Sequence, residues 1–395
     1  MHKKILVIDD SALMRRVISD IINECNEYEV VAIARDGLEG FERIVSNPNL
    51  YSAIILDINM PKMNGIELLK KLQQNKIEQT VIIVSTVAKD GAKETIQALE
   101  YGAFDFVTKP ENYLETKSAE FKEQIRKMLD VATSTRESIE RTKNCVDEND
   151  VPGTSQKSET TVKSSNSLKS KDALLNLRSR TIKNNESAYE VDPLSYRGIK
   201  KHETKLIALA CSTGGPKSLQ HVIPVLPADI DAGMVLVQHM PAGFTASLAL
   251  RLDEMSKVSV KEAQDGDVIK KGCVYIAPGG KHMKVIREGR NHVIRLNNDP
   301  PVEGLRPCAN ITFESLADSA YDEITCVVLT GMGADGTEGI KKLADKKKKI
   351  HVIAQDEDTC VVYGMPKAIA KAGLTDEVVP LNQVAAAITK NVGVN

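Results

Sequence analysis

Three aspartates and one lysine in the first third of the chain are placed to carry out phosphoryl chemistry. Asp9 and Asp10 follow one short apolar run, Asp57 follows another, and Lys109 follows a third. Clustered carboxylates bind a hard cation such as Mg²⁺, which neutralises phosphate charge and lets one carboxylate attack as a nucleophile to give an aspartyl phosphate. We therefore expect Asp9, Asp10 and Asp57 to bind Mg²⁺ and Lys109 to pair with the added phosphoryl oxygens.

A hydroxyl group that follows the apolar run ending at Val84 could bind the same phosphoryl group. Ser85 and Thr86 both stand there, and we favour Thr86. Any one of the three aspartates or Lys109, taken alone, is readily explained as a cap or turn former at the end of a strand. The coincidence of several of them at strand ends makes that explanation weak.

A second group of residues, in the last half of the chain, is placed for nucleophilic catalysis. Ser212 lies in a tight turn after an apolar run, His239 follows the next run, and Asp335 lies in a glycine-rich segment after a later run. A Ser-His-Asp triad needs these types as nucleophile, general base and orienting carboxylate, whatever their order in the chain. Because Ala210 stands two residues before Ser212, the turn is not the G-x-S-x-G elbow of α/β-hydrolases.

The glycines near Ser212 and Asp335 let backbone amides approach a developing oxyanion. We expect the N–H groups of Thr213 and Met332 to form that oxyanion hole. The same loops also fit a phosphate-binding nest, His239 could be a structural histidine, and Asp335 could be a turn residue. A nucleotide-binding or protein-docking module is thus the rival interpretation, although it leaves His239 unexplained.

The elements that must position these residues are short buried strands separated by amphipathic helices, an arrangement that predicts a doubly wound parallel sheet. The expected strands of the N-terminal domain are Ile5–Ile8, Tyr28–Ala34, Ala53–Leu56, Val81–Val84 and Phe104–Val107. Those of the C-terminal domain are Leu206–Ala210, Met234–Val237, Val274–Ala277, Cys326–Leu329 and His351–Ala354. In such sheets the ligand crevice lies at the carboxyl ends of the strands, where the charged residues fall.

A polar segment separates the two groups of strands. After Pro110, apolar residues at helical spacing predict a helix that continues to about Asn144, and from Cys145 to about His202 the sequence is rich in Ser, Thr, Lys, Asn and Asp. Such a segment is typical of a flexible linker. The predicted fold is α/β, with a flavodoxin-like domain over 1–115, a helix extension and linker over 116–203, and a Rossmann-like hydrolase over 204–395.

Composition excludes several classes of protein. The formal net charge of −2 and the lack of a helix-turn-helix pattern argue against a nucleic-acid binder. The seven cysteines show no zinc-site spacing, so reduced thiols are expected. No apolar run is long enough to span a bilayer, and Asp9 and Asp10 interrupt any signal-peptide core. We therefore expect a cytoplasmic protein that is not inserted in a membrane.

The N-terminal domain resembles a response-regulator receiver. The motifs ILVIDDSALMRR, ILDINMPKMNGIELL and GAFDFVTKP match the pattern of that family in order and spacing, over residues 1 to about 115. The resemblance implies that Asp57 is the phosphorylated residue, with Lys109 and Thr86 in support. Asn64 precedes Gly65 where the family often has aspartate, a change that affects a turn.

The C-terminal domain resembles the catalytic domain of the chemotaxis protein-glutamate methylesterases. The segments that carry the likeness are LIALACSTGGPKSL, VQHMPAGFTASLALRL, EAQDGDVIKKGCVYIAPGGKHM, VVLTGMGADGTEGI and AQDEDTCVVYGMPKAIAKAG. Ser212, His239 and Asp335 match the catalytic positions of that family. Two departures are Ala210, where glycine is usual, and GLRPCANITF, where the common run is arginine-proline-serine-valine-aspartate.

The resemblance also implies a substrate and partners. The substrate is a glutamate γ-methyl ester on a methyl-accepting chemotaxis receptor, and the same site is expected to deamidate receptor glutamine. A chemotaxis histidine kinase is the expected phosphodonor. Mg²⁺ serves phosphorylation of the receiver, and no cofactor is expected for the hydrolase. We further expect the unphosphorylated receiver to cover the catalytic cleft.

Overall fold

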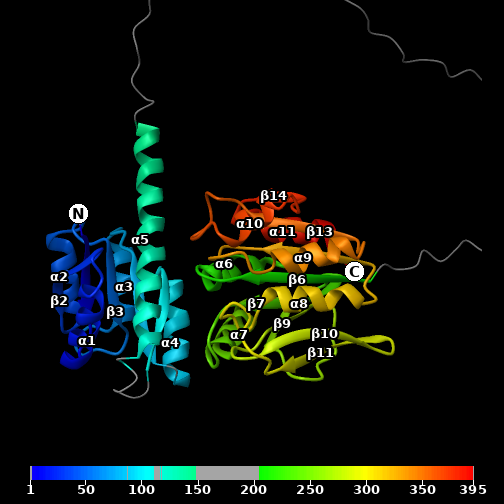
Figure 1. Ribbon diagram of the computed structural model, residues 1–395, viewed down its shortest axis with the longest axis horizontal. Helices are drawn as coiled ribbons and strands as arrows, with labels where there is room; N and C mark the ends of the chain where they lie inside the picture. Colours follow the sequence, from blue (N-terminus) through cyan, green and yellow to red (C-terminus); the bar gives the residue numbers. More distant parts are fainter. Residues whose placement is uncertain (1, 87, 111–115, 117, 148–203, 395) are drawn as a thin grey trace, which may run out of the picture. The chain divides into compact units, whose positions relative to one another are not determined.

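The computed structural model describes residues 2–86, 88–110, 116, 118–147 and 204–394 (Figure 1). One compact unit contains Met1–Thr142 together with Glu203–Asn395. The predicted linker lies outside the described residues from residue 148 onward. No helix among the described ranges combines the length and the apolar character needed to cross a membrane.

The N-terminal domain contains a five-stranded parallel sheet with the strand order β2-β1-β3-β4-β5. The strands are β1 (Lys3–Ile8), β2 (Tyr28–Ala34), β3 (Ala53–Asp57), β4 (Val81–Thr86) and β5 (Asp105–Lys109). The helices are α1 (Ala12–Asn23), α2 (Gly37–Ser46), α3 (Gly65–Gln74), α4 (Lys89–Glu100) and α5 (Ala119–Asp147). This order is the flavodoxin-like one, and it confirms the predicted fold of this domain.

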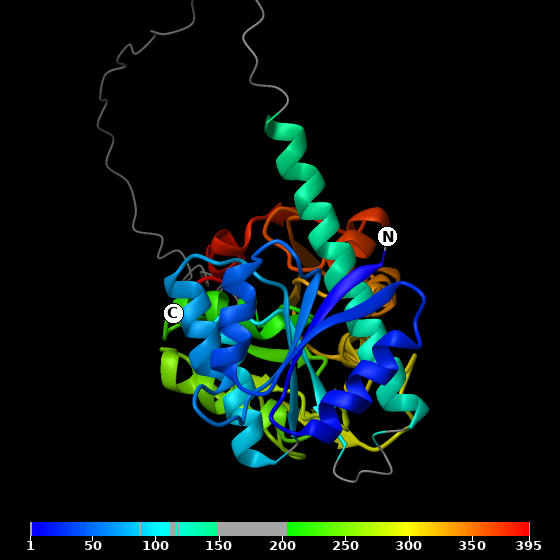
Figure 2. The ribbon, with the colours of Figure 1, turned by 90° about the vertical axis from the view of Figure 1, so that its left-hand side faces the viewer.

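Alternate residues of each strand pack against helices on opposite faces of this sheet, as a parallel sheet requires. Ile5 and Val7 face α1 and α5, whereas Leu6 and Ile8 face the side of α2, α3 and α4. Figure 2 shows these helices around the sheet, with α5 continuing beyond it. The extension of α5 to Asp147 agrees with the predicted helix.

Local polar contacts fix where the helices after β1 and β3 begin. The Ser11 hydroxyl accepts a hydrogen bond from the N–H of Met14 at the start of α1. Asn64 caps α3 through a reciprocal pair of hydrogen bonds with Glu67, so the family departure at Asn64 preserves the cap. Gly65 is required because an added Cβ would lie 2.5 Å from the backbone oxygen of Asp57. The α3 start therefore packs directly against the acid-bearing end of β3.

The C-terminal domain contains a seven-stranded parallel sheet with the order β14-β13-β12-β6-β7-β9-β8. Its strands are β6 (Lys205–Cys211), β7 (Ala232–Gln238), β8 (Ser259–Glu262), β9 (Cys273–Ile276), β12 (Glu323–Val328), β13 (Ile350–Gln355) and β14 (Glu377–Val379). A separate antiparallel hairpin joins β10 (His282–Glu288) to β11 (Asn291–Asn297). The five strands predicted for this domain are present, while β8, β10, β11 and β14 were not predicted.

Helices cover both faces of this sheet. They are α6 (Gly215–Val222), α7 (Phe244–Met255), α8 (Ala309–Ser315), α9 (Thr337–Asp345), α10 (Met365–Lys371) and α11 (Leu381–Val392). Ile207 and Leu209 of β6 belong to the core that contains α6, α7 and α11, whereas Leu206 and Ala208 belong to the core with α8, α9 and α10. The sheet winds outward from β6 in both directions, so its topological switch point lies between β6 and β12.

Phe313, in α8, packs against the first turn of α9, which directly follows the loop that carries Asp335. The side chain is fully buried, and an added Cβ at Gly339 would lie 2.8 Å from the Cβ of Phe313. We expect Phe313→Ala to lower the free energy of unfolding of the C-terminal domain by about 3 to 5 kcal/mol, because it leaves a cavity between α8 and α9. Calorimetry would measure the change. Val225→Ala, at a side chain 66% exposed, is the control, and equal effects of the two substitutions would contradict this packing.

Candidate active site and phosphoacceptor site

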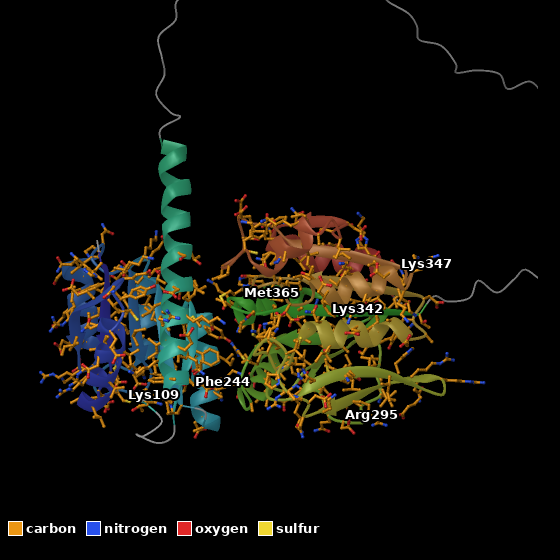
Figure 3. All side chains as sticks on the ribbon, viewed as in Figure 1. Lys109, Phe244, Arg295, Lys342, Lys347 and Met365 are labelled. Atoms are coloured by element: carbon orange, nitrogen blue, oxygen red, sulfur yellow. The ribbon has the colours of Figure 1, made fainter. Side chains whose placement is uncertain are left out.

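Two buried carboxylates share one lysine at the carboxyl edge of the N-terminal sheet. Lys109 Nζ lies 2.9 Å from Asp9 Oδ2 and 2.7 Å from Asp57 Oδ2. Figure 3 labels Lys109 at this edge. Backbone N–H groups hold the other carboxylate oxygens, since Ser11 donates to Asp9 and Ile58 donates to Asp57, each at 2.8 Å. The structure therefore brings together the residues predicted from three strand ends.

The charges of this cluster are balanced only in part. Burial raises the pKa of Asp57, and the negative charge of Asp9 adds to this effect while Lys109 opposes it. Burial alone would lower the pKa of Lys109, but the charges of Asp57 and Asp9 raise it, so the ammonium group remains charged. A carboxylate in this setting gains from a further cation.

The carboxylates of Asp9, Asp10 and Asp57 fit a divalent metal. One oxygen from each lies within 4.8 Å of the others, and Asp10 is exposed to solvent. An all-oxygen set with room for water suits Mg²⁺. The same three residues were predicted as metal ligands from the sequence.

The structure distinguishes the two candidate hydroxyl groups after β4. Ser85 is buried, accepts a hydrogen bond from Thr95 Oγ1 at 2.6 Å and lies 3.3 Å from the backbone oxygen of Gly91. Thr86 is exposed, and its hydroxyl has no hydrogen-bond partner among the described residues. Thr86 is thus the more accessible of the two hydroxyl groups, and its role toward a phosphoryl group stays a prediction.

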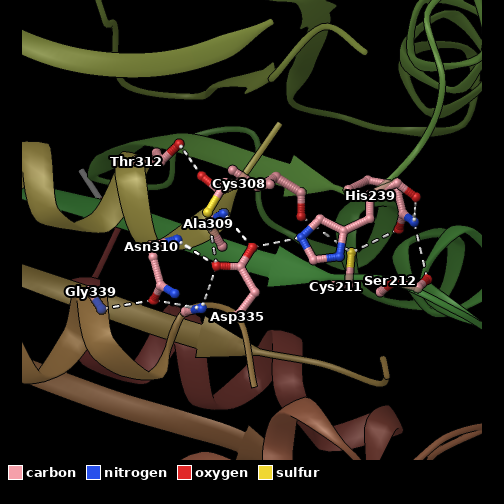
Figure 4. A network of polar contacts seen from close by, with 12 residues as sticks. Cys211, Ser212, His239, Cys308, Ala309, Asn310, Thr312, Asp335 and Gly339 are labelled. Atoms are coloured by element: carbon pink, nitrogen blue, oxygen red, sulfur yellow. Dashed lines mark hydrogen bonds and ion pairs between the residues drawn. The ribbon is translucent and has the colours of Figure 1, made fainter. Parts of the chain in front are cut away.

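In the C-terminal domain, His239 and Asp335 form a buried pair. His239 Nε2 lies 2.7 Å from Asp335 Oδ2. Figure 4 shows Ser212 on the side of the imidazole away from Asp335. Because Nε2 is bonded to Asp335, Nδ1 is the ring nitrogen without that partner, and no hydrogen bond joins the ring to Ser212 Oγ within the described part of the chain. Catalytic hydrogen bonds often tighten only when substrate is bound.

Strand order explains why these three residues meet. Ser212 follows β6, His239 follows β7 and Asp335 lies in the loop after β12, three strands that are neighbours at the switch point. The N–H of Ser212 donates to the backbone oxygen of Thr330 at 3.0 Å. An added Cβ at Gly331 would lie 2.8 Å from the Cβ of Ser212. The loops after β6 and β12 therefore touch directly beside the nucleophile.

Asp335 is held as a carboxylate by five donors at distances from 2.6 to 3.2 Å. They are His239 Nε2 and the Ala309 N–H on Oδ2, and the Cys308 thiol with the Asn310 and Gly336 N–H groups on Oδ1. Burial alone would raise the pKa of Asp335, but the hydrogen bond and charge of His239, followed by the backbone donors, hold it below its usual range. The orienting carboxylate therefore stays ionised near neutral pH.

The predicted oxyanion donors line the same cavity as the nucleophile. Thr213, Met332, Ser212 and His239 all border it. Neither backbone N–H, of Thr213 or of Met332, has an acceptor among the described residues. Free amides beside a serine nucleophile suit an oxyanion, so this assignment stays a prediction that the geometry supports.

Gln238 is a site residue that sequence reasoning missed. Its side-chain Nε2 donates to the backbone oxygens of Ser212 and His239, at 3.0 and 3.1 Å, and its Oε1 accepts from the Cys211 thiol at 3.0 Å. The residue is buried. The Gln238 side chain therefore links the loop that carries Ser212 to the loop that carries His239. The only signal in the sequence was a polar residue at the end of an apolar run.

Replacing Gln238 with leucine removes this link. We expect Gln238→Leu to lower kcat by roughly tenfold or more and to destabilise the domain by about 1 to 3 kcal/mol, since two buried carbonyl groups lose their donor. Steady-state kinetics and calorimetry would measure both effects. Gln383→Leu, at an exposed position of α11, is the control. Unchanged kcat in Gln238→Leu would show that the link has no catalytic role.

Comparisons with known proteins agree with this architecture. The family model for the response regulator receiver domain matches residues 5–119, and that for the CheB methylesterase matches residues 207–388. The protein-glutamate methylesterase/protein-glutamine glutaminase of Desulfotalea psychrophila is 38% identical over 98% of each chain. Proteins of the same name from Syntrophomonas wolfei, covering 97% of each chain, and from Oceanobacillus iheyensis, covering 98% of this chain and 97% of the relative, are also 38% identical.

Fold and site together define a two-domain hydrolase with a receiver domain. The chain belongs to the protein-glutamate methylesterase/protein-glutamine glutaminase family.

Proposed function

We propose that this chain is a phosphorylation-activated protein-glutamate methylesterase that hydrolyses glutamate γ-methyl esters on methyl-accepting chemotaxis receptors and deamidates receptor glutamine. The observation that carries the proposal is the buried His239–Asp335 pair beside Ser212, at the switch point of a sheet in a chain that also carries a receiver. The relatives bear both activities in their names.

The geometry suits a two-step acyl transfer. Ser212 Oγ attacks the ester carbonyl while His239 Nδ1 accepts its proton, and Asp335 stabilises the imidazolium through Nε2. The N–H groups of Thr213 and Met332 stabilise the oxyanion. His239 then protonates the departing methoxide, giving methanol and a glutamyl-serine ester. Water, deprotonated by His239, hydrolyses that ester and frees Ser212. With glutamine the leaving group is ammonia.

The receiver supplies the control. Asp57 is positioned to attack a phosphodonor, and the ammonium group of Lys109 would pair with the transferred phosphoryl oxygens. Asp9, Asp10 and Asp57 would hold Mg²⁺, which when bound neutralises phosphate charge. Thr86 would then hydrogen-bond the phosphoryl group. An added Cβ at Gly91 would lie 2.6 Å from Thr86 Oγ1, so Thr86 packs closely against the first turn of α4. A movement of Thr86 would therefore change its contacts with that turn.

Residues of α4 and β5 contact the hydrolase within the compact unit that both domains share. Glu100 at the end of α4 accepts hydrogen bonds from Arg251 Nε at 2.6 Å and Nη2 at 3.2 Å. Phe106 stacks on Phe244 with ring centroids 4.6 Å apart. We infer that these contacts hold the receiver over the catalytic cleft and that phosphorylation of Asp57 weakens them.

The proposed function also implies partners and a cellular location. A chemotaxis histidine kinase would be the phosphodonor, and the receptors would be the substrate partners. The cysteines of the described residues outside α5 are free, which suits a reducing compartment, so we propose a cytoplasmic location. We also propose domain boundaries near residues 115 and 204, with the intervening segment as helix extension and linker.

The triad is tested by methanol release from methylated receptor membranes. We expect Ser212→Ala to lower the rate at least about 10⁴-fold, because the nucleophile is lost. Ser218→Ala, which removes a buried serine hydroxyl from the neighbouring helix α6, is the matched control and should remain active. Release by Ser212→Ala at the normal rate would rule out the assignment of the nucleophile.

Control by the receiver is tested by measuring the rate of methanol release first without phosphodonor and then with it. We expect Arg251→Ala to raise the unphosphorylated rate roughly fivefold or more, in line with typical coupling free energies of about 1 to 3 kcal/mol, and to reduce further stimulation by a small phosphodonor. Arg126→Ala, which removes an Arg–Glu pair within α5, is the control. An Arg251→Ala protein with the wild-type rate and the wild-type stimulation would contradict the contact-based mechanism.

A further inference from the structure

Cys308 lies against the catalytic carboxylate. Its Sγ is 3.2 Å from Asp335 Oδ1, and only 1% of the residue is exposed. Cys308 precedes α8 directly, and its side chain makes no hydrogen bond that caps the helix. Figure 4 shows the Cys308 thiol beside the Asp335 carboxylate, whose other oxygen faces His239. The established chemistry of the triad assigns no role to this thiol.

The two oxygens of Asp335 have different partners. Oδ2 accepts from His239 Nε2 at 2.7 Å and from the Ala309 N–H at 2.6 Å. Oδ1 accepts from the Cys308 thiol and from two backbone N–H groups, none of which belongs to the catalytic machinery. The donors on Oδ1 fix the rotation of the carboxyl group, so that Oδ2 faces the imidazole.

The thiol is a donor under the conditions in which the enzyme works. Burial, followed by the negative charge of Asp335, raises the pKa of Cys308 to about 12. The sulfur therefore keeps its proton near neutral pH. Because Asp335 is ionised and offers only lone pairs, the proton lies between sulfur and Oδ1.

We propose that Cys308 is a positioning residue of the triad: its thiol donates a hydrogen bond to Oδ1 of Asp335 and so sets the orientation and charge that Asp335 presents to His239. The inference rests on the proposed role of Asp335 in catalysis. It gives a function to a residue at which this chain departs from the common serine of the loop.

The role has a consequence that simple packing does not share. Without the thiol donor, more negative charge remains on Asp335, and the protonated imidazole of His239 is favoured. Protonated His239 cannot accept the proton of Ser212, so the acidic limb of the pH profile moves to higher pH. The titratable groups in contact with Asp335, among the described residues, are His239 from the loop after β7 and Cys308 before α8; the backbone before α9 contributes the Gly336 N–H.

The experiment compares substitutions that keep or remove the donor at two side-chain sizes. Cys308→Ser and Cys308→Thr keep a hydroxyl donor, whereas Cys308→Ala and Cys308→Val do not. Each full-length protein is activated with a small phosphodonor and Mg²⁺, and kcat/KM for methanol release from methylated receptor membranes is measured from acid to alkaline pH. The threonine and valine proteins decide the question if the alanine protein does not fold.

We expect the alanine and valine proteins to lose roughly five- to tenfold in kcat/KM at neutral pH, with the acidic limb moved up by about 0.5 pH unit. The serine and threonine proteins should keep the wild-type limb. Cys326→Ala, at another buried cysteine that does not touch the triad, is the matched control and should also keep it.

The inference is overturned if the acidic limb is the same in all four proteins, or if its position follows side-chain size and not the presence of a donor. Ser212→Ala in the same assay separates this failure from failure of the proposed function. A wild-type rate in Ser212→Ala would refute the triad itself. Loss of activity in Ser212→Ala, with the acidic limb unmoved in the Cys308 variants, would refute only the positioning role.

Discussion

The negative charge of Asp335 is the feature on which the catalytic domain depends. Only 3% of the residue is exposed, and a carboxylate so far from water is tolerated only when hydrogen bonds replace its hydration. The structure supplies five donors, from the loop after β7, the start of α8 and the backbone before α9. These elements are therefore bound to one another through a single charge, and the same charge holds the His239 imidazole, which we propose as the general base.

In the receiver, buried carboxylate charge is compensated by a lysine. Asp9 and Asp57 are buried at the end of a parallel sheet, and Lys109 neutralises only one of their two charges. The uncompensated charge favours binding of a divalent cation, which is the condition for phosphoryl transfer. Both domains thus place charged groups at the carboxyl ends of parallel strands, where loops can approach one another without disturbing the sheet. Contacts from α4 and β5 of the receiver reach α7 of the hydrolase, through Glu100 with Arg251 and Phe106 with Phe244.

Sequence patterns predicted the strand ends and hence the residues that lie on them. The apolar runs that end at Asp57, Ser212 and His239 are buried central strands, β3, β6 and β7, and residues at the carboxyl ends of such strands lie at the crevice, which is why these three could be identified. The edge strand β8 is short and only partly buried and has no continuous apolar run, so it was missed. Gln238 and Cys308 act through contacts with segments about 26 residues away along the chain, and no local pattern predicts such contacts.

We infer that phosphorylation of Asp57 controls the reactivity of Ser212. A fluorophosphonate, which attaches covalently to activated serines, tests it directly when the modified peptide and the rate of labelling are followed by mass spectrometry. We expect an adduct on Ser212 that forms faster after a small phosphodonor and Mg²⁺ are added, with no acceleration in Asp57→Asn. Labelling at another residue, or an equal rate in the presence and absence of phosphodonor, would contradict it.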